Sequence, residues 1–510
     1  MTDPAVSLQT NFSCDLLVVG AGINGAGIAR DAAGRGLRVL LCEQHDLASH
    51  TSSASSKLIH GGLRYLEHYQ FGLVRKSLRE REVLIRAAPH LIRPLRFIMP
   101  HAPHLRPAWM IRLGLLFYDH LARRRMLAGS SNVDLRTHIA GKALQPGYTR
   151  GFCYSDGWAD DARLVAMSAK DAAERGATVL TRTRCIGLNR EHANWTASLQ
   201  RADGRKLTVS ARAVVNATGP WVVDFLRTTA ALKTRHDVRL VQGSHIIVPR
   251  CFEQDEAYVF QGVDRRIVFA LPYEKKFTLI GTTDVDFSGD PATCGTLPSE
   301  IEYLCTAANR YFRNPVSASD VVASYTGVRP LLRDEASNAA AVSRDYALEL
   351  DTQGAPLLSV FGGKITTFRR LSEEALDLLM APLGQNATGW TKTATLPGGD
   401  FKDGDFSALL DELRSRYAWL PVAVRERYAH AYGTRTVRLL ADASQLADLG
   451  DEVLPELYAR EIDYLCREEW ATCAEDILWR RSKLGLHLGP DSGATLDAWL
   501  TRRGADSAIA

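Results

Sequence analysis

A string of closely spaced glycines lies near the start of the chain. Gly20, Gly22 and Gly25 follow an apolar run that favours a buried strand, and small residues that favour a helix come directly after them. In this context the first glycine permits a tight turn, the second lets a pyrophosphate approach the backbone, and the third lets helix and strand pack closely. The spacing therefore predicts a dinucleotide-binding turn, with Asn24 inside it and the phosphates at the helix start.

Two further features narrow the choice of cofactor. Glu43 ends the next apolar run, about 20 residues on, where an acidic side chain bonds a ribose 2′-hydroxyl and disfavours a 2′-phosphate. Ala217 and Gly219 belong to the string Asn-Ala-Thr-Gly at the end of another apolar run. A glycine at that place lets the backbone pass close to a flat cofactor. Together with the first turn, this second string favours FAD over NAD.

A third glycine string carries a cation. Gly363, Lys364 and Thr366 lie where an apolar strand is expected to meet a helix. Hydride transfer to a flavin places negative charge on its ring, and free N–H groups at a helix start, with a lysine beside them, would stabilise that charge. A plain glycine turn with a solvated lysine is the alternative.

Arginines beside glycine-containing turns are candidates for binding a phosphorylated substrate. Arginine suits phosphate because its guanidinium donates two parallel hydrogen bonds. Arg64, which precedes Tyr65, and Arg329 are therefore grouped with Lys364 as candidate phosphate ligands.

Two histidines in glycine-rich settings are candidates for a general base. Removing a hydride from a secondary alcohol also requires an acceptor for the hydroxyl proton. His60 precedes two glycines, and His245 follows Gly243 and Ser244. The sequence does not separate these two candidates.

The hydrophobic pattern predicts the elements that must position these residues. A βαβ unit opens the chain, alternating residues across 233–290 predict an antiparallel sheet, and nearly everything after 391 has helical periodicity. The predicted class is therefore α/β and α+β. The expected divisions are an FAD-binding domain at 12–75, 150–232 and 325–390, a substrate domain at 76–149 and 233–324, and a helical C-terminal domain at 391–510.

The composition is that of a globular protein of two or three domains. Of 510 residues, 46% are hydrophobic and 24% are charged, and the net charge of +4 is too small to predict nucleic-acid binding. Nine cysteines include no CxxC pair, so no metal site and no disulfide framework are expected, and a reducing cytoplasm is the default location. We find no signal peptide and no run of about 20 apolar residues, so any membrane contact should be peripheral.

Longer strings resemble the aerobic, FAD-dependent glycerol-3-phosphate dehydrogenases of bacteria. They are TSSASSKLIHGGLRYLEHY at 51–69, NATGPW at 216–221, GTTD at 281–284, GVRPL at 327–331 and FGGKITTFR at 361–369. The likeness covers nearly the whole chain in the same order. It implies a glycine-oxidase-like flavoprotein with a Rossmann-like FAD domain, an antiparallel-sheet substrate domain and an all-helical C-terminal domain.

The resemblance also implies an activity and a setting. The family oxidises sn-glycerol 3-phosphate to dihydroxyacetone phosphate, lies peripherally on the inner face of the cytoplasmic membrane and passes electrons to ubiquinone. Arg64, Tyr65, Arg329 and Lys364 would surround the substrate, and Arg329 and Lys364 would also act in catalysis. The residues expected along the cofactor by this likeness are Thr51, Ser52, Ser56, Lys57, Gly61 and Gly62. A homodimer is among the assemblies that the sequence allows.

Two points stay open from the sequence. With a single dinucleotide string, filled by FAD, the electron acceptor is a quinone or oxygen, and an oxidase acting on glycerol 3-phosphate or on an amine would share the fold.

Residues 105–125 combine aromatic residues with arginines. This pattern predicts an amphipathic helix that lies at a membrane interface, or one that faces the core with a solvated basic side.

Overall fold

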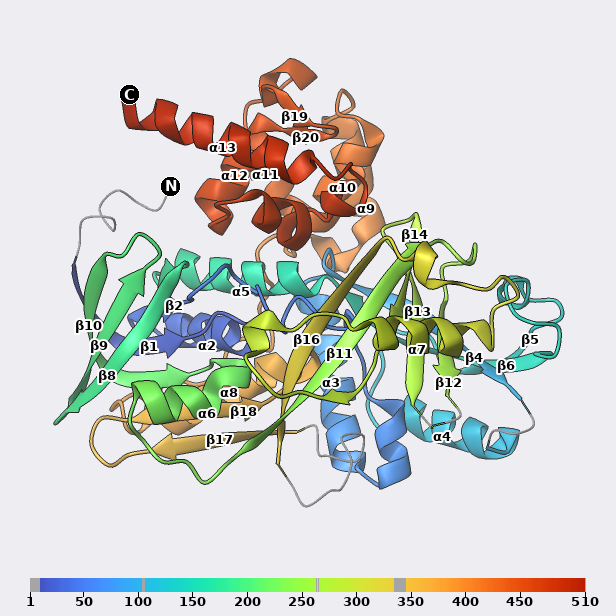
Figure 1. Ribbon diagram of the computed structural model, residues 1–510, viewed down its shortest axis with the longest axis horizontal. Helices are drawn as coiled ribbons and strands as arrows, with labels where there is room; N and C mark the ends of the chain where they lie inside the picture. Colours follow the sequence, from blue (N-terminus) through green and yellow to red (C-terminus); the bar gives the residue numbers. More distant parts are fainter. Residues whose placement is uncertain (1–9, 103–105, 263, 265, 334–344, 510) are drawn as a thin grey trace.

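Two large β-sheets and a helical domain make up the molecule (Figure 1). The computed structural model describes residues 10–102, 106–262, 264, 266–333 and 345–509. The first sheet has eight strands and the second has ten. The helical domain, coloured orange to red, lies at the top of Figure 1.

The first sheet is built around the βαβ unit expected at the start of the chain. β1 (Asn11–Val19) pairs in parallel with β2 (Val39–Cys42) on one side and with β10 (Lys206–Asn216) on the other. β10 in turn pairs in parallel with β18 (Leu357–Gly362). Because parallel strands share the direction of their carboxyl ends, the three glycine strings that follow β1, β10 and β18 meet at one edge of the sheet.

Helices cover one face of this sheet, and a small antiparallel layer covers the other. α2 (Ile23–Gly34) packs with α5 (Asp161–Glu174) and α8 (Phe368–Met380) into one continuous core. Residues of the opposite face share a second core with two antiparallel strands, β8 (Thr183–Glu191) and β9 (Asn194–Arg201). The remaining strands of this sheet are β7 (Thr178–Leu180) and β17 (Tyr346–Asp351).

The second sheet contains the antiparallel strands predicted between 233 and 290. β11 (Val238–Pro249) pairs along most of its length with β16 (Ala323–Leu332), and also with β14 (Phe277–Gly281). β4 (Ile92–His101) pairs with β6 (Arg150–Ala159) over ten residues. Its other strands are β3 (Leu58–Ile59), β5 (Ser131–Asp134), β12 (Ala257–Gln261), β13 (Ile267–Tyr273) and β15 (Val285–Asp286).

The expected domain boundaries and the two sheets divide the chain differently. β6 and β16 lie in the second sheet, although residues from 150 and from 325 onward were expected in the FAD-binding domain. The reason is that strand pairing decides sheet membership, and periodicity does not reveal the partner. Three helices connect or cover this sheet: α3 (Phe71–Ala87), α4 (Ala108–His120) and α7 (Pro298–Asn309).

The C-terminal domain has its own hydrophobic core and one short hairpin among its helices. Its main elements are α9 (Phe406–Arg416), α10 (Val422–Tyr432), α11 (Thr436–Leu440), β19 (Glu452–Leu454), β20 (Leu457–Tyr458), α12 (Ala459–Glu469) and α13 (Ser492–Ile509). The hairpin is a small exception to the all-helical expectation. Buried Arg481 donates at 2.9 Å to Asp46, which follows β2, and Lys483 donates at 2.9 Å to Asp160, which precedes α5. These charged groups would be costly to leave unpaired, so they hold this domain against the rest of the chain.

Candidate active site

The glycine turn after β1 is packed so closely that larger residues do not fit. Gly20 has a φ of +99°, and a Cβ there would lie 2.7 Å from the carbonyl oxygen of Ala217. A Cβ on Gly25 would lie 1.8 Å from the carbonyl oxygen of Gly20. α2 begins at Ile23, whose N–H donates to Ser52 Oγ at 3.0 Å. Two of the glycine strings therefore meet at the N-terminus of α2, where backbone N–H groups favour an anion.

A cleft of about 360 Å³ runs along this turn. Glu43 lines it, and its two carboxylate oxygens accept hydrogen bonds from the N–H groups of Ala21 at 2.8 Å and His45 at 2.9 Å. Burial raises the pKa of the Glu43 carboxyl above its usual range. The predicted cofactor residues that also line the cleft are Gly20, Gly22, Thr51, Ser52, Ala217 and Gly219. An acidic wall beside a helix N-terminus suits the ribose and pyrophosphate of a dinucleotide.

A second cavity, of about 240 Å³, shares the predicted residues Thr51, Ser52 and Gly219 with the cleft. The other predicted residues that line it are Asn24, Ser56, His60, Tyr65, His245, Arg329, Gly363, Lys364 and Thr366. The Nδ2 of Asn24 donates to the carbonyl of Gly362 at 3.2 Å, while its Oδ1 is buried with no hydrogen-bond partner among the described residues. The cavity thus brings together candidates for cofactor, substrate and base, and it presents a buried acceptor that a bound group could satisfy.

Arg329 is held in this cavity by residues to which no role was assigned from the sequence. Its guanidinium forms an ion pair with Asp284 and donates to the carbonyl of Thr283 at 2.9 Å. A Cβ on Gly243 would lie 1.8 Å from Nη2 of Arg329. Asp284 is the last residue of the string GTTD, which contributed to the family likeness although no role was assigned to it. That string was the signal in the sequence that could have pointed to Asp284.

His245 is buried between a tyrosine ring and a glycine. Its ring stacks on Tyr325 with centroids 4.9 Å apart, and a Cβ on Gly281 would lie 2.0 Å from its Cδ2. Nε2 of His245 and the hydroxyl of Ser56 share a hydrogen bond of 2.8 Å. Burial lowers the pKa of His245 well below the ordinary histidine value, and the charges of Arg329 and Lys57 lower it further. The imidazole is therefore neutral at neutral pH and can accept a proton.

Lys364 and Tyr65 both line the cavity and contact each other. The Lys364 ammonium lies 4.1 Å from the centre of the Tyr65 ring, in a cation–π contact. The N–H of His60, which is close in sequence to Tyr65, donates to Thr366 Oγ1 at 3.3 Å. The segment that carries His60 and Tyr65 therefore packs directly on the third glycine string.

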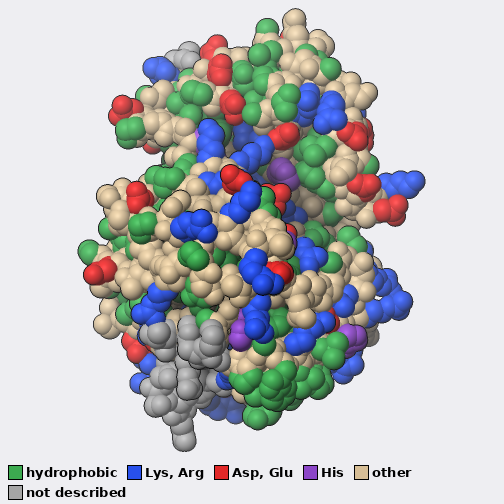
Figure 2. Space-filling model, turned by 90° about the vertical axis from the view of Figure 1, so that its right-hand side faces the viewer, with side chains coloured by type: hydrophobic (Ala, Val, Ile, Leu, Met, Phe, Trp, Pro, Cys, Tyr) green, Lys and Arg blue, Asp and Glu red, His purple; other side chains and the backbone are tan. Residues whose placement is uncertain are grey.

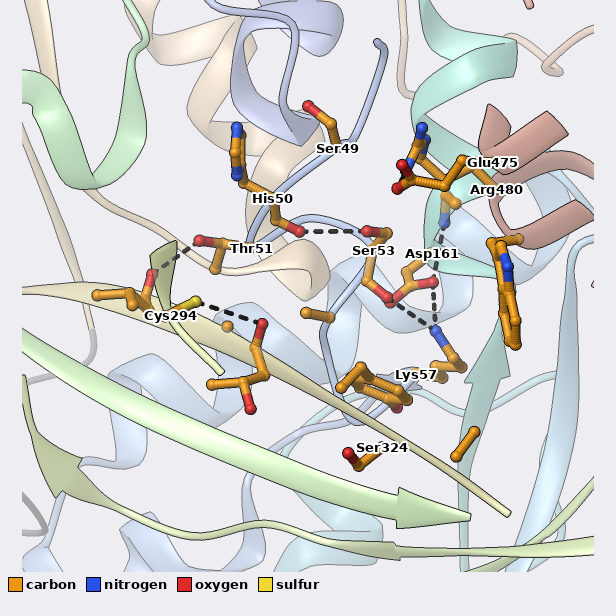
Figure 3. A pocket seen from close by; sticks show the side chains of 18 of the residues that line it. Ser49, His50, Thr51, Ser53, Lys57, Asp161, Cys294, Ser324, Glu475 and Arg480 are labelled. Atoms are coloured by element: carbon orange, nitrogen blue, oxygen red, sulfur yellow. Dashed lines mark hydrogen bonds and ion pairs between the residues drawn. The ribbon is translucent and has the colours of Figure 1, made fainter. Parts of the chain in front are cut away.

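Several of the predicted residues lie outside this cavity. Lys57 donates to Asp161 at 2.7 Å and lines a different space of about 450 Å³, where Figure 3 shows the two side chains pointing toward each other. Arg64, Gly25, Gly61 and Gly62 line neither the cleft nor the second cavity. Among the described residues, no group of three or more His, Cys, Asp or Glu side chains could hold a metal ion.

Known proteins match this chain over nearly its whole length. The family model described as FAD dependent oxidoreductase matches residues 15–369, and the C-terminal domain of alpha-glycerophosphate oxidase matches residues 390–498. The glycerol-3-phosphate dehydrogenase of Pseudomonas aeruginosa is 52% identical, with 95% of this chain and 94% of that protein covered. The aerobic glycerol-3-phosphate dehydrogenase of Escherichia coli and the D-erythritol 1-phosphate dehydrogenase of Brucella abortus are each 49% identical, and the matches span 95% and 96% of this chain and 97% of each of those proteins.

A solved structure connects the fold to its cofactor. The glycerol-3-phosphate dehydrogenase from Bacillus halodurans, complexed with FAD, superposes with a TM-score of 0.74 at 28% identity, covering 92% of this chain and 86% of that one. The cleft along the glycine turn, the acidic Glu43 and the buried Asn24 acceptor fit FAD. The fold class and FAD expected from the sequence are confirmed. The chain belongs to the FAD-dependent oxidoreductase family and, within it, to the glycerol-3-phosphate dehydrogenases.

Proposed function

We propose that this protein oxidises sn-glycerol 3-phosphate to dihydroxyacetone phosphate with FAD as hydride acceptor. The observation that carries the proposal is the meeting of Arg329, Lys364 and His245 in one cavity that adjoins the cofactor cleft. Two cations suit a phosphate group, and a buried neutral imidazole suits the proton of a substrate hydroxyl. Two relatives that are 52% and 49% identical bear the name of glycerol-3-phosphate dehydrogenase, which supports the same substrate.

The phosphate would be bound by side chains whose orientation is already fixed. Arg329 is held by Asp284 and by the backbone of Thr283, so little further ordering is needed when it binds an anion. Lys364 would contribute a point charge, placed by its contact with the Tyr65 ring. Arg64, on the same short helix as Tyr65, is proposed as a further ligand because the family strings include it.

The hydroxyl proton would pass to His245. FAD supplies the acceptor for the hydride. His245 is proposed as the base because burial and neighbouring cations keep its imidazole neutral, and its Nε2 shares a hydrogen bond with Ser56 that holds the ring. His60 lines the same cavity and is the alternative base.

The experiment that tests this function is anaerobic reduction of the purified holoenzyme. Glycerol 3-phosphate should bleach the visible flavin absorbance, whereas glycine and sarcosine should not. Addition of a ubiquinone analogue should restore the absorbance quickly and air slowly. Fast recovery in air would assign a glycerol-3-phosphate oxidase, and bleaching by the amines alone would assign an amine oxidase.

D-erythritol 1-phosphate is the second candidate substrate. One relative that is 49% identical bears that name, so the identity level does not distinguish the two substrates. Both molecules present a phosphate to the same cations. The ratio of kcat/KM for the two polyol phosphates, measured side by side on the same preparation, decides between them.

We propose further that the protein lies on the inner face of the cytoplasmic membrane and reduces a membrane quinone. No helix among the described residues is long and apolar enough to span a bilayer. α4 instead exposes apolar side chains along one face: Trp109 is 66% exposed, Leu116 46% and Phe117 54%. Arginines follow directly at 123–125. Hydrophobic side chains gather at the lower end of Figure 2, where Figure 1 places α4, and basic side chains lie above them.

An exposed apolar face with adjacent arginines is typical of an interfacial helix, because aromatic residues enter the headgroup region and cations attract anionic lipid. Sedimentation with vesicles that contain anionic lipid tests this part of the proposal. Binding should weaken in Trp109→Ser/Phe117→Ser protein and at high salt, and should persist in Val422→Ser protein, which loses an apolar side chain exposed in the C-terminal domain. Equal binding by all three proteins would reject α4 as the contact.

A further inference from the structure

The inner face of α4 contacts the backbone of the segment that carries His60 and Tyr65. The Tyr118 hydroxyl accepts a hydrogen bond from the N–H of Gly61 at 2.8 Å and donates to the carboxylate of Asp156 at 2.8 Å. Tyr118 and Asp156 are both only 2% exposed. Burial raises the pKa of the Tyr118 hydroxyl well above its usual value, so it remains a donor to Asp156.

The carboxylate that receives this hydrogen bond is itself fixed. Arg81 of α3 donates to Asp156 at 2.5 Å and to the carbonyl of Ser155 at 3.0 Å. Arg81 is 1% exposed, so the ion pair lies inside the protein. A buried carboxylate that has both a cation and a hydroxyl donor resists displacement, because loss of either partner is costly.

The segment that carries His60 and Tyr65 packs tightly against Tyr118. A Cβ on Gly61 would lie 2.6 Å from the Tyr118 hydroxyl oxygen, and Gly62 has a φ of +76° with the Tyr65 ring directly over it. From the other side, Thr366 accepts from the N–H of His60, and Lys364 contacts the Tyr65 ring. The segment is therefore held between α4 and the third glycine string.

We propose that Tyr118 is a positioning residue for substrate binding. Tyr118 does not line the cavity. Through Gly61 it fixes residues 60–65 against Lys364, and so holds His60 and Tyr65 at the cavity wall. The inference rests on the proposed function, because the binding roles of Tyr65 and Lys364 belong to it.

Tyr118→Phe is the variant that tests the inference, since it removes only the hydroxyl. The KM for glycerol 3-phosphate should rise about three- to tenfold, as expected when the hydrogen bond from the Gly61 N–H to the hydroxyl is lost, while kcat changes less than about twofold. The FAD content should be unchanged, and hydrogen exchange at the Gly61 amide should accelerate in the substrate-free holoenzyme. Asp156→Asn should likewise raise the KM and accelerate hydrogen exchange at the Gly61 amide. It serves as the second variant if Tyr118→Phe folds poorly.

Tyr258→Phe is the matched control. Tyr258 is a fully buried tyrosine of β12, in the sheet that carries Asp156, and its hydroxyl donates to the carbonyl of Ala140, away from the cavity. It should leave the KM and the Gly61 exchange unchanged. An unchanged KM with unchanged exchange in Tyr118→Phe would overturn the inference, as would an equal effect of the control. If glycerol 3-phosphate fails to bleach even the parent enzyme, the proposed function fails instead, and the exchange at Gly61 still reports whether Tyr118 anchors the segment.

Discussion

The guanidinium of Arg329 occupies the place that a side chain on Gly243 would fill. Gly243 lies on β11 opposite Gly327 of β16, and Arg329 follows two residues further along β16. A Cβ on Gly243 would lie 1.8 Å from Nη2 and 2.8 Å from Cζ of Arg329. The missing side chain on one strand therefore makes room for the guanidinium of the other, and directs it toward Thr282 and Asp284.

Gly243→Ala should displace the Arg329 guanidinium and weaken substrate binding. A charged hydrogen bond is worth about 1.5–3 kcal/mol, so the KM for glycerol 3-phosphate should rise at least about tenfold. FAD content should remain normal, because the change lies outside the cofactor cleft. Steady-state kinetics and the flavin spectrum measure both. Gly147→Ala is the control, since a Cβ there meets nothing within 4 Å; a similar KM for the two variants would contradict the steric argument.

Arg329→Lys should lose most of the substrate affinity although it keeps the charge. One ammonium cannot donate to Asp284, Thr282 and Thr283 in the planar geometry of a guanidinium. The KM should rise about 10- to 100-fold, with FAD still bound. Arg136→Lys is the control, because Arg136 forms an exposed ion pair with Asp134, where such pairs contribute little. Release of FAD from Arg329→Lys would show that the residue supports the cofactor instead.

Motifs tied to local geometry were predictable from the sequence, and contacts across strands were not. The turn at Gly20–Gly25 follows β1 and opens α2 as expected, because strand, turn and helix are adjacent in the chain. Asp284 could not be linked to Arg329 without the pairing of β11, β15 and β16. Lys57 follows Ser56 in sequence, but its side chain pairs with Asp161 and lines a different cavity from that of Ser56. The family likeness alone did not reveal which cavity Lys57 lines.

Gly22→Val should abolish FAD binding. Gly22 caps α2, and a Cβ there would already lie 3.0 Å from Ser52 Oγ, before the two methyl groups of valine are added. Those methyl groups would occupy the place where the backbone approaches a pyrophosphate. The purified variant should lack flavin absorbance and should not recover it after incubation with excess FAD. Gly147→Val is the size-matched control at an open position, and a normal flavin spectrum in Gly22→Val would remove this turn from the cofactor site.

His245→Gln should slow flavin reduction and leave substrate affinity nearly unchanged. Glutamine can keep a hydrogen bond to Ser56, but it cannot accept the hydroxyl proton, and loss of a general base costs about 10²- to 10⁴-fold in rate. The sign of the pH effect follows from the lowered pKa of His245. A base must be deprotonated to act, and lowering the pKa keeps it so. The rate constant for anaerobic bleaching in the parent enzyme should therefore stay level through about pH 6.5, where an ordinary histidine would lose activity, and should fall only in stronger acid. A larger defect in His60→Gln than in His245→Gln would assign the base to His60.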